Sequence, residues 1–211
     1  MPAIRYLALG DSYTIGESVS ESDRWPNQLA GLIEASPQFT ESIGETREGI
    51  ELTIIARTGW TTDELAASIR EHNITETFSF VSLLIGVNNQ YRGRDVENYK
   101  QEFKQLLEQA IVFAKGKPEH VFVISIPDWG VTPFAEGKDK AKVAHEIDAY
   151  NNAAKEIVLA HKCHYIEITE STRKNGTDVQ YLAGDGLHPS GKEYTVWAER
   201  LKDAVMKEFA K

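Results

Sequence analysis

Short apolar runs alternate with longer amphipathic ones along this chain of 211 residues, and that alternation predicts an α/β protein. The short runs have the length and β-branched content of strands, whereas the longer ones repeat apolar residues every three or four positions, as helices do. Parallel strands need crossover connections, which helices usually supply. We therefore expect a mostly parallel sheet with helices on both of its faces.

Each expected element follows from its own pattern. The expected strands are residues 4–9, 51–56, 80–85, 120–126 and 163–168, and the expected helices are residues 26–35, 62–71, 96–114, 139–161 and 190–209. The clearest helical stripe consists of Tyr99, Phe103, Leu106, Leu107, Ala110 and Phe113. Because the sequence contains no internal repeat, low-complexity tract or linker, we expect residues 1–211 to form a single domain.

The overall composition excludes several classes of partner. With 41% hydrophobic residues the chain can build a substantial core, and its 32 acidic and 23 basic residues give a formal net charge of -9. Nucleic acids and anionic membranes both require a basic surface, so neither is an expected partner. The sequence contains no run of about 18 apolar residues, so we expect a soluble protein without a transmembrane segment.

The sequence says less about compartment and assembly. Cys163 is the only cysteine, which excludes an intrachain disulfide. The first residues lead straight from a short apolar run into a polar turn, without the long apolar region of an export signal. Both a cytoplasmic location and export with removal of a signal therefore stay open, as does the oligomeric state.

Ser12 follows the first expected strand directly, in the stretch LALGDSYTIGESV. In parallel sheets, ligands bind beyond the carboxyl ends of the strands, so Ser12 is a candidate nucleophile. The simpler interpretation is that Asp11 or Ser12 only caps the next helix, because both residue types are favoured there. A serine hydroxyl is a weak nucleophile without a base to take its proton. The question is whether the chain has such a base.

The best candidate base lies in LAGDGLHPSG, close to the last expected helix. Asp185 and His188 are three residues apart in a glycine-flanked turn, a spacing that allows the carboxylate to reach the imidazole. Such a contact would select the histidine tautomer and stabilise the imidazolium that forms when the serine proton is accepted. An ordinary turn with a solvent-facing histidine is the alternative.

Two further strand ends carry groups that could stabilise an oxyanion. Asn88, in GVNNQYRG after the third expected strand, has an amide donor, and Gly86 allows close approach of the backbone. Gly59, in ARTGWTTDEL, follows the second strand, and Thr61 or Thr62 is expected to cap the next helix. Each signal is weak alone, because loop asparagines and glycines usually only make turns.

Together, the four motifs resemble the sequence blocks of the SGNH hydrolases, also called GDSL esterases and lipases. GDS at 10–12, the glycine of RTGW, GVNN at 86–89 and DGLH at 185–188 occur in the family's order. The resemblance implies a flavodoxin-like, three-layer α/β/α sandwich with about five parallel strands, which agrees with the strand count above. It also implies a serine hydrolase that needs no cofactor and no metal.

The resemblance assigns a role to each matching residue. Ser12 would be the nucleophile, His188 its base and Asp185 the group that orients the base. The oxyanion hole would consist of the N–H groups of Ser12 and Gly59 and the side-chain amide of Asn88.

The chain departs from the family pattern at two places. Tyr13-Thr14 follows GDS where the family's name has leucine, at a position that varies. Asn89 stands where the third block often has aspartate; it can still accept a hydrogen bond from a backbone N–H, but without charge, so a less firmly held loop is expected.

Four residues are candidates for the substrate site. Asp11 is expected to hold the turn beside the nucleophile, and Trp60 is the neighbour of Gly59. Trp129 and Phe134 follow the fourth expected strand, where they could line a pocket or cover the core.

Competing motifs are weaker. GLHPSGK at 186–192 matches the start of a P-loop, but Glu193 stands where serine or threonine would bind magnesium. The elbow G-x-S-x-G of α/β-hydrolases fails because Thr14 occupies its last position. HKCH at 161–164 contains three potential metal ligands, but its tight spacing without a fourth ligand is poor evidence for zinc.

We therefore expect a serine esterase that forms an acyl-enzyme with a small-molecule ester, in particular a short-acyl ester such as an acetyl group on a carbohydrate or another polar alcohol. Two alternatives stay open. One is a lysophospholipase or thioesterase that acts on longer acyl chains, and the other is a catalytically inactive relative that only binds its ligand.

Overall fold

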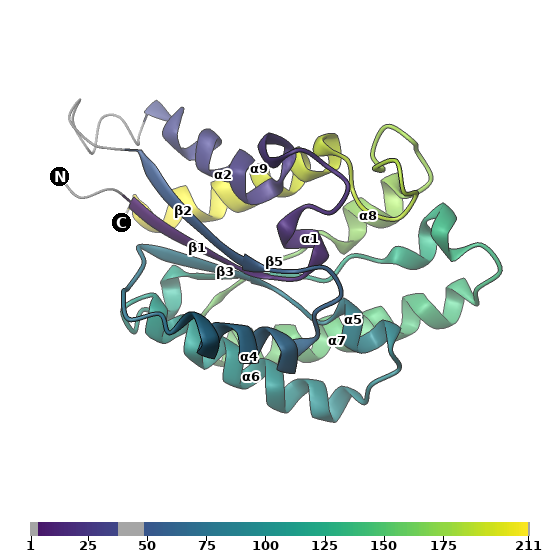
Figure 1. Ribbon diagram of the computed structural model, residues 1–211, viewed down its shortest axis with the longest axis horizontal. Coiled ribbons are helices and arrows are strands. Elements are labelled where there is room, and N and C mark those ends of the chain that lie inside the picture. Colours follow the sequence, from purple (N-terminus) through teal and green to yellow (C-terminus); the bar gives the residue numbers. More distant parts are fainter. Residues whose placement is uncertain (1–3, 38–48, 211) are drawn as a thin grey trace.

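The computed structural model describes residues 4–37 and 49–210, and within them one sheet of five parallel strands lies between two layers of helices (Figure 1). The strands are β1 (Ile4–Gly10), β2 (Ile50–Ala56), β3 (Phe80–Leu84), β4 (Val121–Ile124) and β5 (His164–Ile166), arranged in the order β2-β1-β3-β4-β5. The predicted three-layer α/β/α fold is confirmed.

The long helices cover the two faces of the sheet. In Figure 1, α2 (Trp25–Glu34) and α9 (Gly191–Phe209) lie on one face, and α4 (Thr62–His72), α6 (Val96–Phe113) and α7 (Lys140–Ala160) lie on the other. All five were predicted to within two residues at either end. The six apolar positions predicted for α6 are the six that it buries.

Three short helices were not predicted: α1 (Ser12–Ile15), α5 (Val87–Tyr91) and α8 (Thr169–Asn175). Each has seven residues or fewer, too few for a helical period to become visible in the sequence. The predicted strands 120–126 and 163–168 were also too long, because apolar residues continue past the last paired residue of β4 and β5. The unpredicted α1 and α5 start directly beyond strands β1 and β3.

The order of the strands decides what meets at the carboxyl edge of the sheet. β1 pairs in parallel with β2 on one side and β3 on the other, with Gly10 opposite both Ala56 and Leu84. Residues 6–9 of β1 are buried, as expected for a strand covered on both faces. The three chain segments that follow β1, β2 and β3 therefore emerge side by side.

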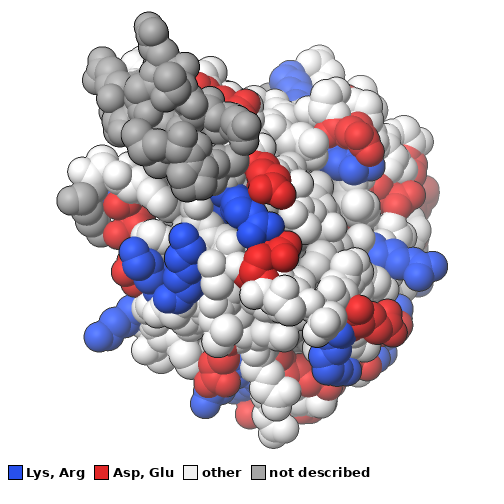
Figure 2. Space-filling model, turned by 60° about the vertical axis from the view of Figure 1, so that its left-hand side comes forward, with Lys and Arg blue, Asp and Glu red and all other residues white. Residues whose placement is uncertain are grey.

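Charge is mixed on the surface shown in Figure 2, where basic and acidic side chains are interspersed rather than gathered by sign. Arg5, for example, pairs with both Glu51 and Glu76. Within residues 4–37 and 49–210, no helix is long and apolar enough to span a membrane.

Gly86 occupies the residue before α5 with a φ of 134°, a conformation available essentially only to glycine. A Cβ atom there would lie 2.8 Å from the ring of the buried Tyr99, whose hydroxyl donates a hydrogen bond to the Ile85 carbonyl. Both the backbone and its surroundings thus exclude a side chain at the start of the segment that carries Asn88.

We predict that Gly86→Ala lowers the free energy of unfolding by about 2 to 4 kcal/mol, the sum of backbone strain and the collision with Tyr99. Gly93→Ala is the matched control: Gly93 also has a positive φ, 66°, but a Cβ there would meet open space. It should cost only about 1 kcal/mol. Urea denaturation of both variants measures the difference, and equal costs would contradict the role given to Tyr99.

Candidate active site

The turn after β1 presents Ser12 at the start of α1. The Asp11 side chain caps this helix by accepting a hydrogen bond from the Tyr13 N–H (3.0 Å), and Ser12 is the first helical residue. The sequence left cap and nucleophile as alternatives for this pair. In the structure Asp11 is the cap, and Ser12 lines a cavity.

The turn before α9 brings the predicted carboxylate and base together. Asp185 Oδ2 lies 2.7 Å from His188 Nδ1, and Asp185 Oδ1 accepts hydrogen bonds from the backbone N–H groups of Leu187 and His188, both at 2.9 Å. The His188 side chain is buried, whereas Asp185 is partly exposed. Donation from Nδ1 to the carboxylate leaves Nε2 as the acceptor nitrogen of a neutral imidazole.

The environment of Asp185 keeps it ionised. Partial burial raises the pKa of this carboxyl group, but hydrogen bonds from the His188 ring, from the His188 and Leu187 N–H groups and from the Ser18 hydroxyl outweigh it. The net effect holds the pKa well below its usual range. A carboxylate that stays charged can stabilise an imidazolium when His188 accepts a proton.

The two predicted oxyanion donors lie on neighbouring segments. Gly59 adopts a φ of 87° in the loop after β2, and Asn88 lies in the first turn of α5. The Asn88 side-chain amide donates a hydrogen bond to the Trp60 carbonyl (2.9 Å), which orients the amide and leaves its second N–H for another acceptor.

Several hydrogen bonds tie these two segments to each other. Thr62 N–H donates to Asn89 Oδ1 (3.1 Å), and Asn89 Nδ2 lies 2.6 Å from Thr62 Oγ1. The predicted ability of Asn89 to accept a backbone N–H is thereby confirmed. The same residue also donates to Thr62, which an aspartate carboxylate cannot do.

Arg92 makes further contacts with the Gly59 loop and with α4 that the sequence did not predict. Its guanidinium donates to the Gly59 carbonyl (2.6 Å) and pairs with Glu64 (3.3 Å). Thr61, one of the two predicted caps, is the N-cap residue directly before α4, and its N–H donates to the Glu64 side chain. The loop that carries Gly59 is therefore held by α5 and by its own helix.

Most of the residues predicted for the site line one cavity of about 170 Å³. Asp185 stands behind it, bonded to His188. The described residues that line the cavity are Ser12, Tyr13, Thr58, Gly59, Val87, Asn88, Tyr91, Trp129, Phe134, Leu187 and His188. Two predicted substrate-site residues, Asp11 and Trp60, are absent from this lining.

Three aromatic rings form one wall of the cavity. Trp129 is buried and donates to Gln90 Oε1 (2.8 Å), and its ring centroid lies 5.2 Å from that of Tyr91 and 6.0 Å from that of Phe134. Tyr91 is 51% exposed and Phe134 44%, so both stand at the rim. Sequence reasoning missed Tyr91, although its i+3 spacing from Asn88 would have indicated it had α5 been predicted.

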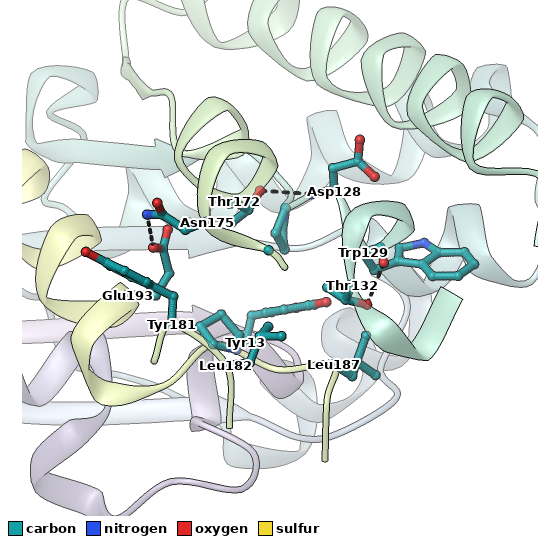
Figure 3. Close-up of a pocket in the computed structure, with 13 residues that line it drawn as sticks. Tyr13, Asp128, Trp129, Thr132, Thr172, Asn175, Tyr181, Leu182, Leu187 and Glu193 are labelled. Atoms are coloured by element: carbon teal, nitrogen blue, oxygen red, sulfur yellow. Dashed lines mark hydrogen bonds between the residues drawn. The ribbon is translucent and has the colours of Figure 1, made fainter. Parts of the chain in front are cut away.

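Tyr13, Trp129 and Leu187 line both this cavity and a smaller one of about 20 Å³, which is shown in Figure 3. The smaller cavity has room for about one water molecule. Among its lining residues, Glu193 is buried and accepts hydrogen bonds from Ser171, Asn175 and Trp197.

Ser12 and His188 line the same cavity without a direct hydrogen bond in the described part of the chain. Catalytic hydrogen bonds are often long before substrate binds. The Tyr13 ring, next to Ser12 in the chain, contacts the His188 ring with centroids 5.1 Å apart and so packs against the imidazole.

The chain belongs to the GDSL-like lipase/acylhydrolase family, whose model matches residues 8–196. Members of this family are carboxylic ester hydrolases. A search of the curated proteins found no match.

Solved structures share the fold at low sequence identity. The lipase Lip_vut3 from a goat rumen metagenome is 18% identical with a TM-score of 0.73, covering 95% of this chain and 97% of its own. A putative lipolytic protein of the G-D-S-L family from Desulfitobacterium hafniense is 14% identical with a TM-score of 0.72, covering 95% and 98%. A mutant of Axe2, an acetyl-xylooligosaccharide esterase from Geobacillus, is 18% identical with a TM-score of 0.70, covering 96% and 94%.

Asp11 is fully buried, and its Oδ2 atom has no hydrogen-bond partner among the described residues. Burial raises the pKa of this carboxyl group to about 7, against the lowering effect of the backbone N–H groups of Tyr13 and of Asp11 itself. In the unfolded chain the pKa of aspartate is about 3.9. The folded protein therefore holds a proton that the unfolded chain has lost between about pH 4 and pH 7, and stability declines as the pH rises through that window.

We predict that Asp11→Asn raises the melting temperature at pH 8 by several degrees, because asparagine keeps the cap to Tyr13 N–H without a buried charge. The gain should shrink steadily as the pH is lowered towards 4. Asp139→Asn, at the exposed cap of α7, is the control and should show no gain at pH 8. Thermal melts from pH 4 to 8 measure both, and a gain independent of pH would contradict the burial of a titrating charge.

Proposed function

We propose that this protein is a serine carboxylic ester hydrolase that works through an acyl-enzyme. The observation that carries the proposal is the 2.7 Å contact between Asp185 and His188, with His188 and Ser12 lining one cavity. A serine hydroxyl is activated as a nucleophile when a histidine can take its proton and a charged carboxylate orients that histidine. Membership of the GDSL-like family supports the same reaction class.

In the proposed acylation step, Ser12 Oγ attacks the ester carbonyl carbon while His188 Nε2 takes the serine proton. The negative charge moves to the carbonyl oxygen, where the N–H groups of Ser12 and Gly59 and the Asn88 amide donate to it. When the carbonyl re-forms, the bond to the alcohol breaks, and the alcohol oxygen takes the proton from His188. Asp185 stays ionised throughout and stabilises the imidazolium.

Deacylation repeats these roles with water as the nucleophile. His188 takes a proton from the water molecule as its oxygen attacks the acyl carbon, and the same donors hold the second oxyanion. The bond to Ser12 Oγ then breaks, the serine recovers its proton from His188, and the free acid leaves.

The size of the cavity favours a short acyl group. A cavity of about 150 Å³ holds one benzene molecule, so the 170 Å³ here suits an acyl group of a few carbons together with part of the alcohol. The exposed rings of Tyr91 and Phe134 at the rim support contact with a bulky polar alcohol such as a sugar. Axe2, a relative in fold, is an acetyl-xylooligosaccharide esterase.

We predict that Ser12→Ala lowers kcat for p-nitrophenyl acetate on the order of 10⁴-fold or more, because no other group can form the acyl-enzyme. Ser22→Ala, which removes an exposed hydroxyl from the same N-terminal segment, should keep full activity. Far-ultraviolet circular dichroism checks that both variants fold. Substantial activity in Ser12→Ala would refute the nucleophile, and a folded wild type without esterase activity would support the inactive relative.

We predict that kcat/KM falls at least about ten-fold from p-nitrophenyl acetate to p-nitrophenyl octanoate, because the longer chain exceeds a cavity that suits an acyl group of a few carbons. The series acetate, butyrate, octanoate measures acyl preference with a constant alcohol. Acetylated xylo-oligosaccharide compared with ethyl acetate then measures the preference for the alcohol. A maximum at octanoate would instead support the lysophospholipase or thioesterase alternative.

A further inference from the structure

Ser18 contacts the predicted orienting carboxylate from outside its turn. It lies in the loop after α1, and its hydroxyl donates a hydrogen bond to Asp185 Oδ2 (2.8 Å), 167 residues away in the sequence. Neither residue was linked to the other by any sequence pattern. Asp185 Oδ2 is also the oxygen atom that accepts the hydrogen bond from His188 Nδ1.

The other donors to Asp185 come from its own turn. Oδ1 accepts hydrogen bonds from the N–H groups of Leu187 and His188, and Oδ2 accepts a hydrogen bond from the His188 ring. These bonds hold the carboxylate relative to residues 185–188 but do not connect it to the segment that carries the nucleophile. Among the described residues, the hydroxyl of Ser18 is the one donor to this carboxylate from another segment.

The backbone before Ser18 is attached directly to the nucleophile. The N–H groups of Gly16 and Glu17 both donate to the Ser12 carbonyl, at the end of the short helix α1. Glu17 also accepts a hydrogen bond from the hydroxyl of Thr58, the neighbour of Gly59. Ser18 therefore projects from a loop held against Ser12 on one side and the Gly59 segment on the other.

Ser18 reaches Asp185 from a strained backbone conformation. Its φ is 64°, in the left-handed region, which costs a residue with a side chain some stability. Glycine would adopt this conformation without that cost, but it has no hydroxyl. Strain that persists at a contact with a functional group is a pointer to function.

We propose that Ser18 is a positioning residue for catalysis, which ties the loop of the nucleophile to the carboxylate of Asp185 and thereby sets His188 Nε2 against Ser12 Oγ. The inference rests on the proposed serine hydrolase function. Ser18 touches neither substrate nor reacting atoms and acts only through Asp185. Losing its hydroxyl lowers kcat about three- to ten-fold, the worth of roughly one hydrogen bond, and leaves KM unchanged.

Three substitutions separate the hydroxyl from the backbone strain. Ser18→Ala and Ser18→Gly both lack the hydroxyl, but only glycine relieves the positive φ, so glycine gives the higher melting temperature. Ser18→Thr keeps a hydroxyl and adds a β-branch to a left-handed residue, which lowers the melting temperature. We expect equal losses of kcat in the alanine and glycine variants, and kcat near wild type in the threonine variant.

Lys115→Gly is the matched control for strain. Lys115 also has a positive φ, 62°, and lies just beyond the end of α6, outside the cavity lining. Its replacement should raise the melting temperature and leave kcat unchanged. If kcat in the Ser18 series followed the melting temperature instead of the hydroxyl, Ser18 would have a structural role only and the proposal would fail.

A double-mutant cycle with Asp185→Asn tests whether the effect passes through Asp185. Ser18→Gly should lower kcat in the wild-type background and cause little or no further loss in the Asp185→Asn background. Equal losses in both backgrounds would overturn the proposal, as would no loss in either. If Asp185→Asn itself had wild-type activity, the proposed triad would fail, which is a different outcome from a failure of Ser18 alone.

Discussion

The parallel pairing of β1 with both β2 and β3 is the constraint on which the candidate site depends. Because β1 lies between the other two, the segments that follow the three strands emerge beside one another at the same edge of the sheet. One carries Ser12, the next Gly59 and the third Asn88. A different strand order would separate these groups, whatever their identities.

Hydrogen bonds between loops then fix the positions that the sheet has made possible. The Gly59 segment and α5 are held together through Asn88, Asn89 and Arg92, which bond to Trp60, Thr62 and Gly59. In the proposed mechanism, donors that are already oriented need not reorganise when charge develops on a substrate oxygen. The neutral Asn89 contributes to the link between the two segments, because it both accepts a hydrogen bond from the Thr62 N–H and donates one to Thr62 Oγ1.

The site also contains features that cost stability. Asp11 buries a carboxyl group with one oxygen unpartnered among the described residues, and Ser18 adopts a left-handed conformation. Both flank Ser12 on one short segment. Local costs of this kind persist where the surrounding structure over-determines them, and here the surroundings include the buried residues 6–9 of β1 and the bonds to the Ser12 carbonyl.

The sequence by itself determined the fold class, the long elements and the residues of the Asp185–His188 turn, because these follow from local periodicity and spacing. It did not determine α1 or α5, which are too short to show a period, nor the contacts of Tyr91, Arg92 and Ser18. The tertiary structure alone likewise decided which aromatic and acidic candidates line the cavity. Trp129 and Phe134 do, whereas Asp11 and Trp60 do not. Such contacts join segments distant in the chain, and their geometry depends on how the loops pack after the sheet has formed.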